Sequence, residues 1–301
     1  PAGCTSTVNT SPLGPATCVA EAPCQWSGTQ SYSYFGYALD GGADVNGDGR
    51  EDVVVGAPMQ DGSGSDRADS GAVFIISGAA LDDGIDGRIA SMEGAAAGDY
   101  AGTSVALLGD TNGDSLADIL VGARGSDEGG AEAGSALLYL GTDGDWSHLE
   151  PTLTLTGERD YARVGTTVAA VGDTNGDGLA DLLVSGELRL MNEDTGSESY
   201  GPGRVYLVHG RDWESAATSS VADADVAWSG EGDGHAAGLG LARGGDLNGD
   251  GFTDPVIGAP YAASYKGRVY ALPGGADLTS SSLSEAPIQI DGESSYDTFG
   301  W

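Results

Sequence analysis

Residues 44–58 read DVNGDGREDVVVGAP, an aspartate-rich loop that runs directly into an apolar segment. The same arrangement returns as DTNGDSLADILVGAR at residues 110–124, DTNGDGLADLLVSGE at 173–187 and DLNGDGFTDPVIGAP at 246–260. Successive copies begin 63 to 73 residues apart, and a fixed period of this kind indicates one supersecondary unit per repeat. We therefore interpret the chain as an array of similar units.

A pair of glycines precedes each loop at a constant distance. One glycine stands eight residues before the first aspartate, and the other stands eight residues earlier still. The pairs are Gly28 and Gly36, Gly94 and Gly102, Gly157 and Gly165, and Gly230 and Gly238. Gly292 and Gly300 repeat the spacing, with Phe299 before the second glycine. We therefore expect a fifth repeat to begin near the end of the chain.

Each unit contains four short apolar segments of strand length. The first follows the Phe-Gly position, the second follows the aspartate loop, the third follows a variable loop, and the fourth precedes the next glycine. The third strands are predicted at 72–76, 136–140, 205–208 and 269–272, and the fourth at 89–92, 153–155, 226–228 and 288–290. Repeated units of four antiparallel strands predict an all-β fold of the β-propeller type.

The predicted division of the chain follows from these repeats. Residues 1–24 form a leader or linker rich in Cys, Pro, Ser and Thr, and residues 25–301 form the propeller. Complete blades are expected at about 35–94, 101–157, 164–230 and 237–292, and a further blade starts at 298–301. Residues 25–27 are expected to be the outer strand of a preceding blade. With four complete blades and strands on either side of them, we expect the ring in this chain to be incomplete, and a ring closed with four blades is the alternative.

All three cysteines, Cys4, Cys18 and Cys24, lie in the leader. An odd number suggests one local disulfide and one partner outside the chain, which is typical of an oxidising compartment. Ala2-Gly3-Cys4 also matches the end of a lipoprotein cleavage site, but Pro1 is unfavourable before it. We expect a disulfide-tied leader, and a lipid anchor is the alternative.

The charge balance restricts the classes of partner. The chain has 46 acidic residues against 12 Lys and Arg, which gives a net charge of -34. Nucleic acids and anionic membranes bind through basic patches, so both are disfavoured. Divalent cations or basic partners suit this charge better. No stretch approaches the roughly 18 apolar residues that a membrane-spanning helix needs.

The aspartate loops have the donor set of a calcium site. Ca²⁺ takes six to eight hard oxygens, and a tight loop can supply side chains at positions 1, 3, 5 and 9 and a backbone carbonyl at position 7. The predicted ligands are Asp44, Asn46, Asp48, Arg50 and Asp52; Asp110, Asn112, Asp114, Leu116 and Asp118; Asp173, Asn175, Asp177, Leu179 and Asp181; and Asp246, Asn248, Asp250, Phe252 and Asp254. The prediction is about four Ca²⁺ ions, one for each complete blade.

The residues of these loops are less consistent with two other interpretations. An EF-hand needs a bidentate Glu at position 12, where this chain has Val55, Val121, Val184 or Ile257. Asp, Asn and Gly also populate ordinary hairpin turns, but four copies in the same register, each with Asp at position 9, favour calcium. Ser115 replaces glycine at position 6 of the second loop, so that site is predicted to be weaker.

These motifs resemble the FG-GAP repeat of integrin α-subunit propellers and their bacterial relatives. Phe35-Gly36 opens a blade, and Gly56-Ala57-Pro58 and Gly258-Ala259-Pro260 close second strands, whereas Arg124 and Ser185-Gly186-Glu187 depart from the pattern. The resemblance covers residues 25 to 301. It implies a seven-bladed propeller of the integrin α type, with calcium loops on the lower face and ligand recognition on the upper face.

The resemblance places the ligand-binding loops between the second and third strands of each blade. These loops are 57–71, 123–134, 186–203 and 259–267, and they vary in length while the aspartate loops do not. Variable surface loops on a constant scaffold are typical of binding sites. Tyr261, Tyr265, Lys266 and Arg268 form the aromatic and basic cluster among them.

The predicted function is a calcium-binding recognition scaffold, secreted or displayed at the cell surface, that binds a protein or matrix ligand as in cell adhesion. No catalytic residues are predicted. One alternative is a calcium-dependent lectin, in which Trp26, Trp146, Trp213 and Trp228 could stack on sugars. A polysaccharide lyase or hydrolase is less favoured, because Lys266 is the only lysine in the chain.

Overall fold

The computed structural model describes residues 26–28, 30–64, 66–79, 88–144, 146, 149–192, 197–213 and 217–301. The leader at residues 1–24, and with it the pairing of Cys4, Cys18 and Cys24 and the question of a lipid anchor, lies outside the described residues. Residue 25, the first of the predicted preceding strand, lies outside them as well. The fold is therefore described from residue 26 onward.

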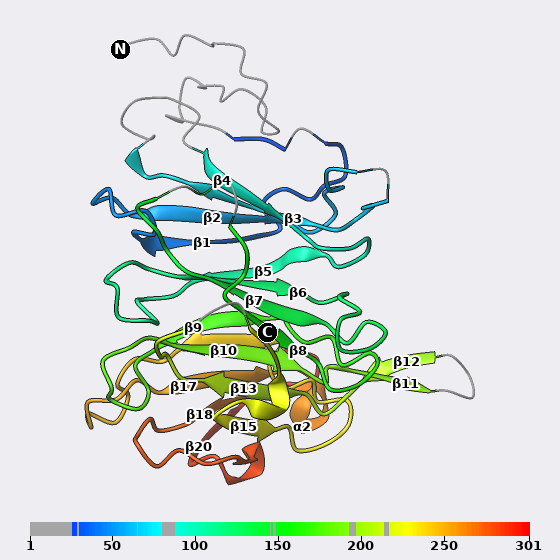
Figure 1. Ribbon diagram of the computed structural model, residues 1–301. Helices are drawn as coiled ribbons and strands as arrows, with labels where there is room; N and C mark the ends of the chain where they lie inside the picture. The colour runs from blue at the N-terminus through cyan, green and yellow to red at the C-terminus, as the bar shows by residue number, and fades with distance from the viewer. Residues whose placement is uncertain are drawn as a thin grey trace, which may run out of the picture.

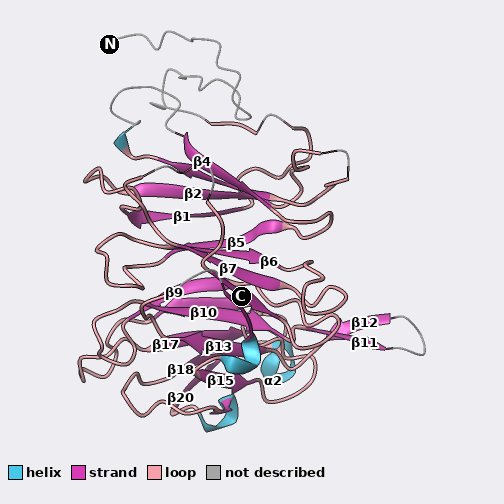
Figure 2. Ribbon diagram, viewed as in Figure 1, coloured by secondary structure: helices cyan, strands magenta, loops and turns pink. Residues whose placement is uncertain are grey.

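Four larger sheets and one two-stranded sheet are present in the described residues, and the four larger sheets contain the predicted blades (Figures 1 and 2). Blade 1 contains β1 (Ala38–Ala43), β2 (Asp52–Ala57), β3 (Ala72–Ile76) and β4 (Arg88–Glu93), and blade 2 contains β5 (Ala101–Leu107), β6 (Ile119–Ala123), β7 (Ser135–Tyr139) and β8 (Leu153–Thr156). Blade 3 contains β9 (Val168–Gly172), β10 (Asp181–Gly186), β13 (Arg204–Val208) and β15 (Val226–Ser229), and blade 4 contains β16 (Gly240–Arg243), β17 (Pro255–Ala259), β18 (Arg268–Ala271) and β20 (Ile288–Asp291).

Neighbouring strands pair antiparallel within each of these four-stranded sets. The predicted third and fourth strands begin and end within one residue of the observed ones. The prediction of an all-β chain built from four-stranded antiparallel sheets is confirmed.

Some elements were not predicted. β14 (Ala217–Ser220) and β19 (Ser281–Ser282) leave their own blades and pair in parallel with β8 and β15, the outer strands of the preceding blades. β11 (Arg189–Asn192) and β12 (Ser197–Tyr200) form a hairpin inside a predicted loop. The other short elements are α2 (Ala262–Tyr265) and the 3-10 turns η1 (Val221–Asp223) and η2 (Leu283–Glu285).

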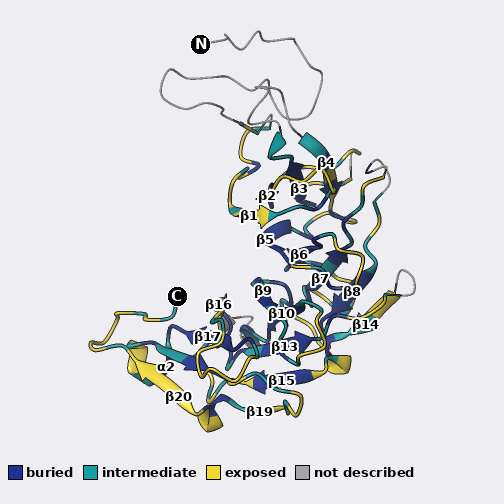
Figure 3. Cartoon of the chain, turned by 90° about the vertical axis from the view of Figure 1, so that its left-hand side faces the viewer, coloured by how far each residue is buried: buried dark blue, intermediate teal, exposed yellow. Residues whose placement is uncertain are grey.

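The four blades follow one another along an arc, with β1, β5, β9 and β16 on its concave side (Figure 3). The apolar cores lie between blades rather than within them. Ile75 and Ile119 join blades 1 and 2, Leu138 and Leu182 join blades 2 and 3, and Leu207 and Ile257 join blades 3 and 4, and all six side chains are fully buried. Each sheet thus depends on its neighbours to cover its faces. The expectation that further blades complete a ring stays a prediction.

Paired glycines allow the blades to approach at the backbone. A Cβ atom on Gly122, at the end of β6, would lie 1.9 Å from the carbonyl oxygen of Gly165 in the next repeat. Gly165 itself has a φ of 79°, which favours glycine. The glycine near the end of the second strand therefore packs directly against the glycine that opens the next repeat. In blade 3, Ser185 replaces the first of these glycines, and its Oγ accepts a hydrogen bond from the Thr167 N–H at 2.9 Å.

The close approach at Gly122 predicts a strong effect of a single methyl group. Gly122→Ala is expected to destabilise the protein by about 3 kcal/mol or more, because a backbone carbonyl cannot move aside as a side chain can. Gly232→Ala is the matched control, since the nearest atoms to its added Cβ are 3.8 Å away and belong to His235. Thermal and denaturant unfolding of both variants measure the difference, and equal stabilities would contradict the proposed contact.

Candidate functional site

The four aspartate loops share one set of internal hydrogen bonds. In the first loop, the Asp44 carboxylate accepts the backbone N–H groups of Gly47 and Gly49, each at 2.8 Å. The position-5 carboxylate then accepts the N–H of position 7, as Asp48 does from Arg50 at 2.9 Å. The second loop keeps the same pattern even though Ser115 stands at position 6, with a φ of 73°. A serine in this region costs about 1 to 2 kcal/mol relative to glycine.

The position-9 aspartates are buried beneath their loops. Asp118 is fully buried, and its carboxylate accepts the Thr111 N–H at 2.9 Å, the Thr111 hydroxyl at 2.5 Å and the Gly141 N–H at 2.9 Å. Burial raises the pKa of Asp118 to about 6, and the hydrogen bonds from Thr111 and Gly141 oppose that rise. Asp52, Asp181 and Asp254 make the equivalent pairs of backbone hydrogen bonds. The position-9 carboxylate therefore joins the aspartate loop to the turn that follows the third strand of the same blade.

The loops are also linked from blade to blade. The position-8 N–H of each later loop donates to the position-1 carbonyl of the loop before it. These bonds run from Ala117 to Asp44 at 3.0 Å, from Ala180 to Asp110 at 2.8 Å and from Thr253 to Asp173 at 2.9 Å. The four loops thus form a continuous row, and we call the side of the molecule that carries it the lower face.

The aspartate loops offer oxygen ligands of the kind that a hard cation prefers. Positions 1, 3 and 5 contribute carboxylate and amide oxygens, which Ca²⁺ prefers. The position-5 aspartates are exposed, as Asp48 and Asp114 show. Within the described ranges, however, no three His, Cys, Asp or Glu side chains are gathered closely enough to hold a metal ion. The assignment of individual ligands therefore stays a prediction.

The opposite side, the upper face, carries the predicted aromatic cluster in an enlarged form. Tyr261 packs on Tyr200 with ring centroids 4.5 Å apart and on Trp301 at 5.8 Å, while Tyr265 stacks on Tyr296 at 5.8 Å. Burial and the hydrogen bond with the Tyr200 hydroxyl raise the pKa of Tyr261 to about 12. The sequence did not predict that this cluster would also include Tyr200, Tyr296 and Trp301.

The basic residues of the predicted cluster differ in their partners. Arg268 is bound to Glu231 at 2.9 Å and to Asp291 through hydrogen bonds, so its charge is neutralised within the protein. Arg189, from the unpredicted hairpin, lies over the ring of Tyr200 at 4.2 Å and brings another cation to the aromatic cluster. The backbone carbonyl of Lys266 accepts the Phe299 N–H at 3.0 Å.

The tryptophans considered for sugar stacking are largely core residues. Trp228 and Trp146 are buried, and the partly buried Trp213 packs against the core while its Nε1–H donates to the Thr111 hydroxyl at 3.1 Å. Buried indole rings offer no face to a sugar. Trp146 and Trp228 are therefore removed from the candidate glycan site.

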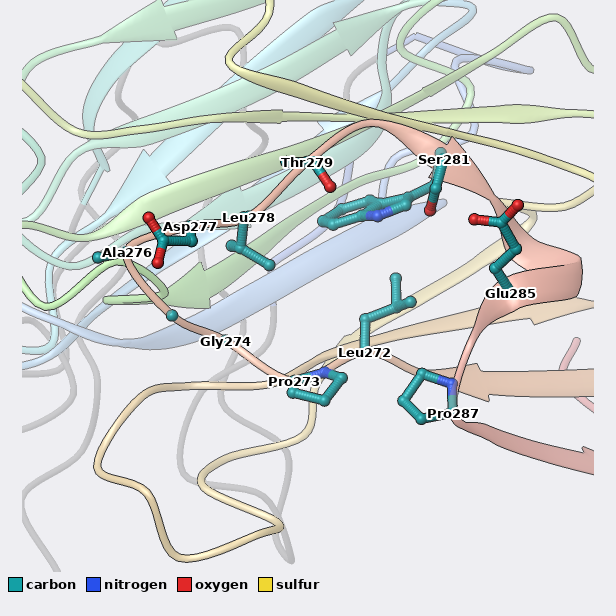
Figure 4. A pocket seen from close by; sticks show the side chains of 12 residues that line it. Leu272, Pro273, Gly274, Ala276, Asp277, Leu278, Thr279, Ser281, Glu285 and Pro287 are labelled. Carbon is teal, nitrogen blue, oxygen red and sulfur yellow. The ribbon is translucent and has the colours of Figure 1, made fainter.

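A cavity of about 410 Å³ lies beside Trp228, at the junction of blades 3 and 4. Leu272, Leu278 and Pro287 line it, and Figure 4 shows the carboxylates of Asp277 and Glu285 at its opposite ends.

Comparisons with known proteins agree with this architecture. The model of the FG-GAP repeat matches residues 35–76 and 237–272, and that of the FG-GAP-like repeat matches residues 110–184. Integrin alpha-5 of Xenopus laevis is 30% identical over 241 residues, which are 75% of this chain and 20% of that protein. Integrin alpha-IIb of Mus musculus is 34% identical over 171 residues, 55% of this chain and 15% of that protein.

Integrin alpha-PS3 of Drosophila melanogaster is also similar, with 29% identity over 259 residues, 82% of this chain and 20% of that protein. The chain thus spans a fifth or less of the length of these curated relatives. In the part of the chain that the structure describes, no helix has the length and apolar character needed to cross a membrane.

In the absence of calcium, the buried position-9 aspartates are expected to contribute more to stability than the exposed position-5 aspartates. In excess chelator, Asp118→Asn should lower the free energy of unfolding by about 2 kcal/mol, because an amide nitrogen replaces an oxygen that accepts buried N–H groups. Asp114→Asn should change it by less than about 0.5 kcal/mol, since this side chain is exposed and keeps an accepting oxygen. Chemical unfolding measures both, and a larger loss for Asp114→Asn would contradict this division.

Proposed function

The chain belongs to the FG-GAP repeat family and is an integrin α-like β-propeller protein, and we propose on this basis that it is an extracellular recognition scaffold rather than an enzyme. One observation carries the proposal. The lower face repeats a single hydrogen-bonded loop four times, whereas the loops between the second and third strands differ in length, hairpin content and aromatic content. A constant frame with one variable face is typical of a binding module.

The proposed cofactor is Ca²⁺, at one site for each complete blade. The residues that would hold it are those at positions 1, 3, 5, 7 and 9 of each loop, for example Asp110, Asn112, Asp114, Leu116 and Asp118. A bound cation would offset the repulsion between carboxylates in a chain whose net charge is -34. Because the loops are hydrogen-bonded to one another, stabilising one of them also stabilises its contact with the next blade.

The proposed ligand is a protein or matrix component that binds the upper face, at the cell surface or in the extracellular space. A second candidate is a glycan, because the upper-face aromatic cluster includes well-exposed rings. Tyr296 and Trp301 are 79% and 72% exposed, and open aromatic faces suit sugar stacking. Both candidates use the same face of the molecule and the same calcium-stabilised frame.

Calcium is predicted to bind and stabilise the folded chain. At free calcium about 100 times the dissociation constant, each site adds about 2.7 kcal/mol, which is about 5 °C in melting temperature for a domain of this size. Calorimetric titration should give about four ions per chain, and Asp114→Asn should remove one of them. A chain that binds no calcium, or melts at one temperature in calcium and in chelator, contradicts the proposed cofactor.

Ligand recognition is predicted to require the upper face. The purified chain should bind at least one member of a panel of immobilised extracellular-matrix proteins in calcium, and chelator should weaken that binding. Tyr261→Ala should weaken it at least tenfold if the aromatic cluster takes part, while Asp212→Ala, an exposed change near β13, should not. Binding to a glycan array with no matrix protein bound would support the lectin instead, and no binding in either assay contradicts both.

A further inference from the structure

Every Asn-Gly sequence in this chain lies in an aspartate loop, with the asparagine at position 3 and the glycine at position 4. The four pairs are Asn46-Gly47, Asn112-Gly113, Asn175-Gly176 and Asn248-Gly249. Asn-Gly favours deamidation, because glycine has no Cβ to hinder the approach of its nitrogen to the asparagine side chain. The row of loops that links the blades is therefore exposed to this reaction unless the folded loop prevents it.

Deamidation needs a reactive backbone nitrogen and a side chain that can turn towards it. In the second loop, the Gly113 nitrogen loses its proton and attacks the side-chain carbonyl carbon of Asn112. A C–N bond closes a five-membered imide, the bond from that carbon to Nδ2 breaks, and ammonia leaves with the proton. Water then opens the imide at either carbonyl, which gives aspartate or isoaspartate at position 3.

The position-4 N–H is held by a carboxylate in all four loops. Gly113 donates it to Asp110 at 2.6 Å. The negative charge of this acceptor opposes the anion that forms when the nitrogen loses its proton, and the hydrogen bond itself must break before the nitrogen can attack. The same bond joins Gly47 to Asp44 at 2.8 Å, Gly176 to Asp173 at 2.6 Å and Gly249 to Asp246 at 2.6 Å.

The asparagine side chain is held at both of its polar atoms. The Oδ1 of Asn112 accepts the Asp114 N–H at 3.1 Å, and its Nδ2 donates to the Asp114 carboxylate at 2.9 Å. Rotation of the side chain towards Gly113 would have to break these bonds. The other loops repeat both bonds, between Asn46 and Asp48, Asn175 and Asp177, and Asn248 and Asp250.

We propose that the four aspartate loops are latent deamidation sites, kept intact by the hydrogen bond from the position-4 N–H to the position-1 carboxylate. An Asn-Gly pair reacts only while its own loop is open, and local opening of a surface segment requires less free energy than unfolding of the whole chain. Each reaction is irreversible. The position-3 residues therefore accumulate a chemical record of loop opening, and the protection uses only groups that belong to the chain.

The products change both the charge and the backbone of a loop. Conversion at all four sites adds four negative charges, which takes the net charge from -34 to -38. Isoaspartate also adds a methylene group to the main chain between positions 3 and 4. Isoaspartate at position 112 lies two residues from the Asp110 carbonyl that accepts the Ala180 N–H, so it is expected to weaken the link between blades 2 and 3.

The test compares Asp110→Ala with Asp114→Ala by peptide mapping and mass spectrometry during incubation in calcium at mildly alkaline pH. Both variants remove one carboxylate from the same loop, but only Asp110 accepts the Gly113 N–H. Asp110→Ala should speed deamidation of Asn112 at least tenfold over the wild-type chain, and Asp114→Ala should speed it less than threefold. The other three loops should keep their wild-type rates. Unfolding of the wild-type chain in urea should speed the reaction at least tenfold in all four loops.

Three results would overturn the proposal. They are a rate at Asn112 in the folded wild-type chain within threefold of the rate in urea, equal rates in the two variants, and a rise of the same size in all four loops of Asp110→Ala. Circular dichroism verifies that each variant is folded. If Asp110→Ala does not fold, Asp173→Ala and Asp177→Ala make the same comparison at Asn175, because Asp173 accepts the Gly176 N–H.

Discussion

The row of hydrogen bonds between consecutive aspartate loops is the interaction on which the rest of the structure depends. Each link joins the position-8 N–H of one repeat to the position-1 carbonyl of the repeat before it, as between Ala117 and Asp44. Beneath each loop, a buried carboxylate such as Asp118 accepts hydrogen bonds from the loop and from the turn after the third strand, and so it joins the two segments of one blade. The result is a lower face whose geometry is set by the backbone and is the same in every repeat.

This arrangement separates the stability of the scaffold from the chemistry of recognition. Each lower-face loop carries three aspartates, and backbone N–H groups and the proposed cations can offset their charge. On the upper face, several acidic residues are paired with arginines, as Glu132 is with Arg163 and Glu158 with Arg204. The variable loops can therefore change in length and content while the frame that supports them stays constant.

Much of the fold could be predicted from the sequence because its main signals are local and repeated. The apolar runs after the aspartate loops predicted β2, β6, β10 and β17 in all four blades. β14 and β19 were missed because their residues, Ala217–Ser220 and Ser281–Ser282, are small and polar and show no alternation. At Asp118 the sequence indicated an oxygen donor, but its burial depends on packing.

The most direct test of the account is amide hydrogen exchange at the position-8 residues Ala117, Ala180 and Thr253, followed by NMR in the presence of calcium. If these loops link the blades, the three amides should exchange as slowly as the central strand amides of β6, although they lie in turns at the edge of the molecule. Exchange at the rate of unprotected peptide amides would show that the loops are independent surface turns, and it would contradict the account.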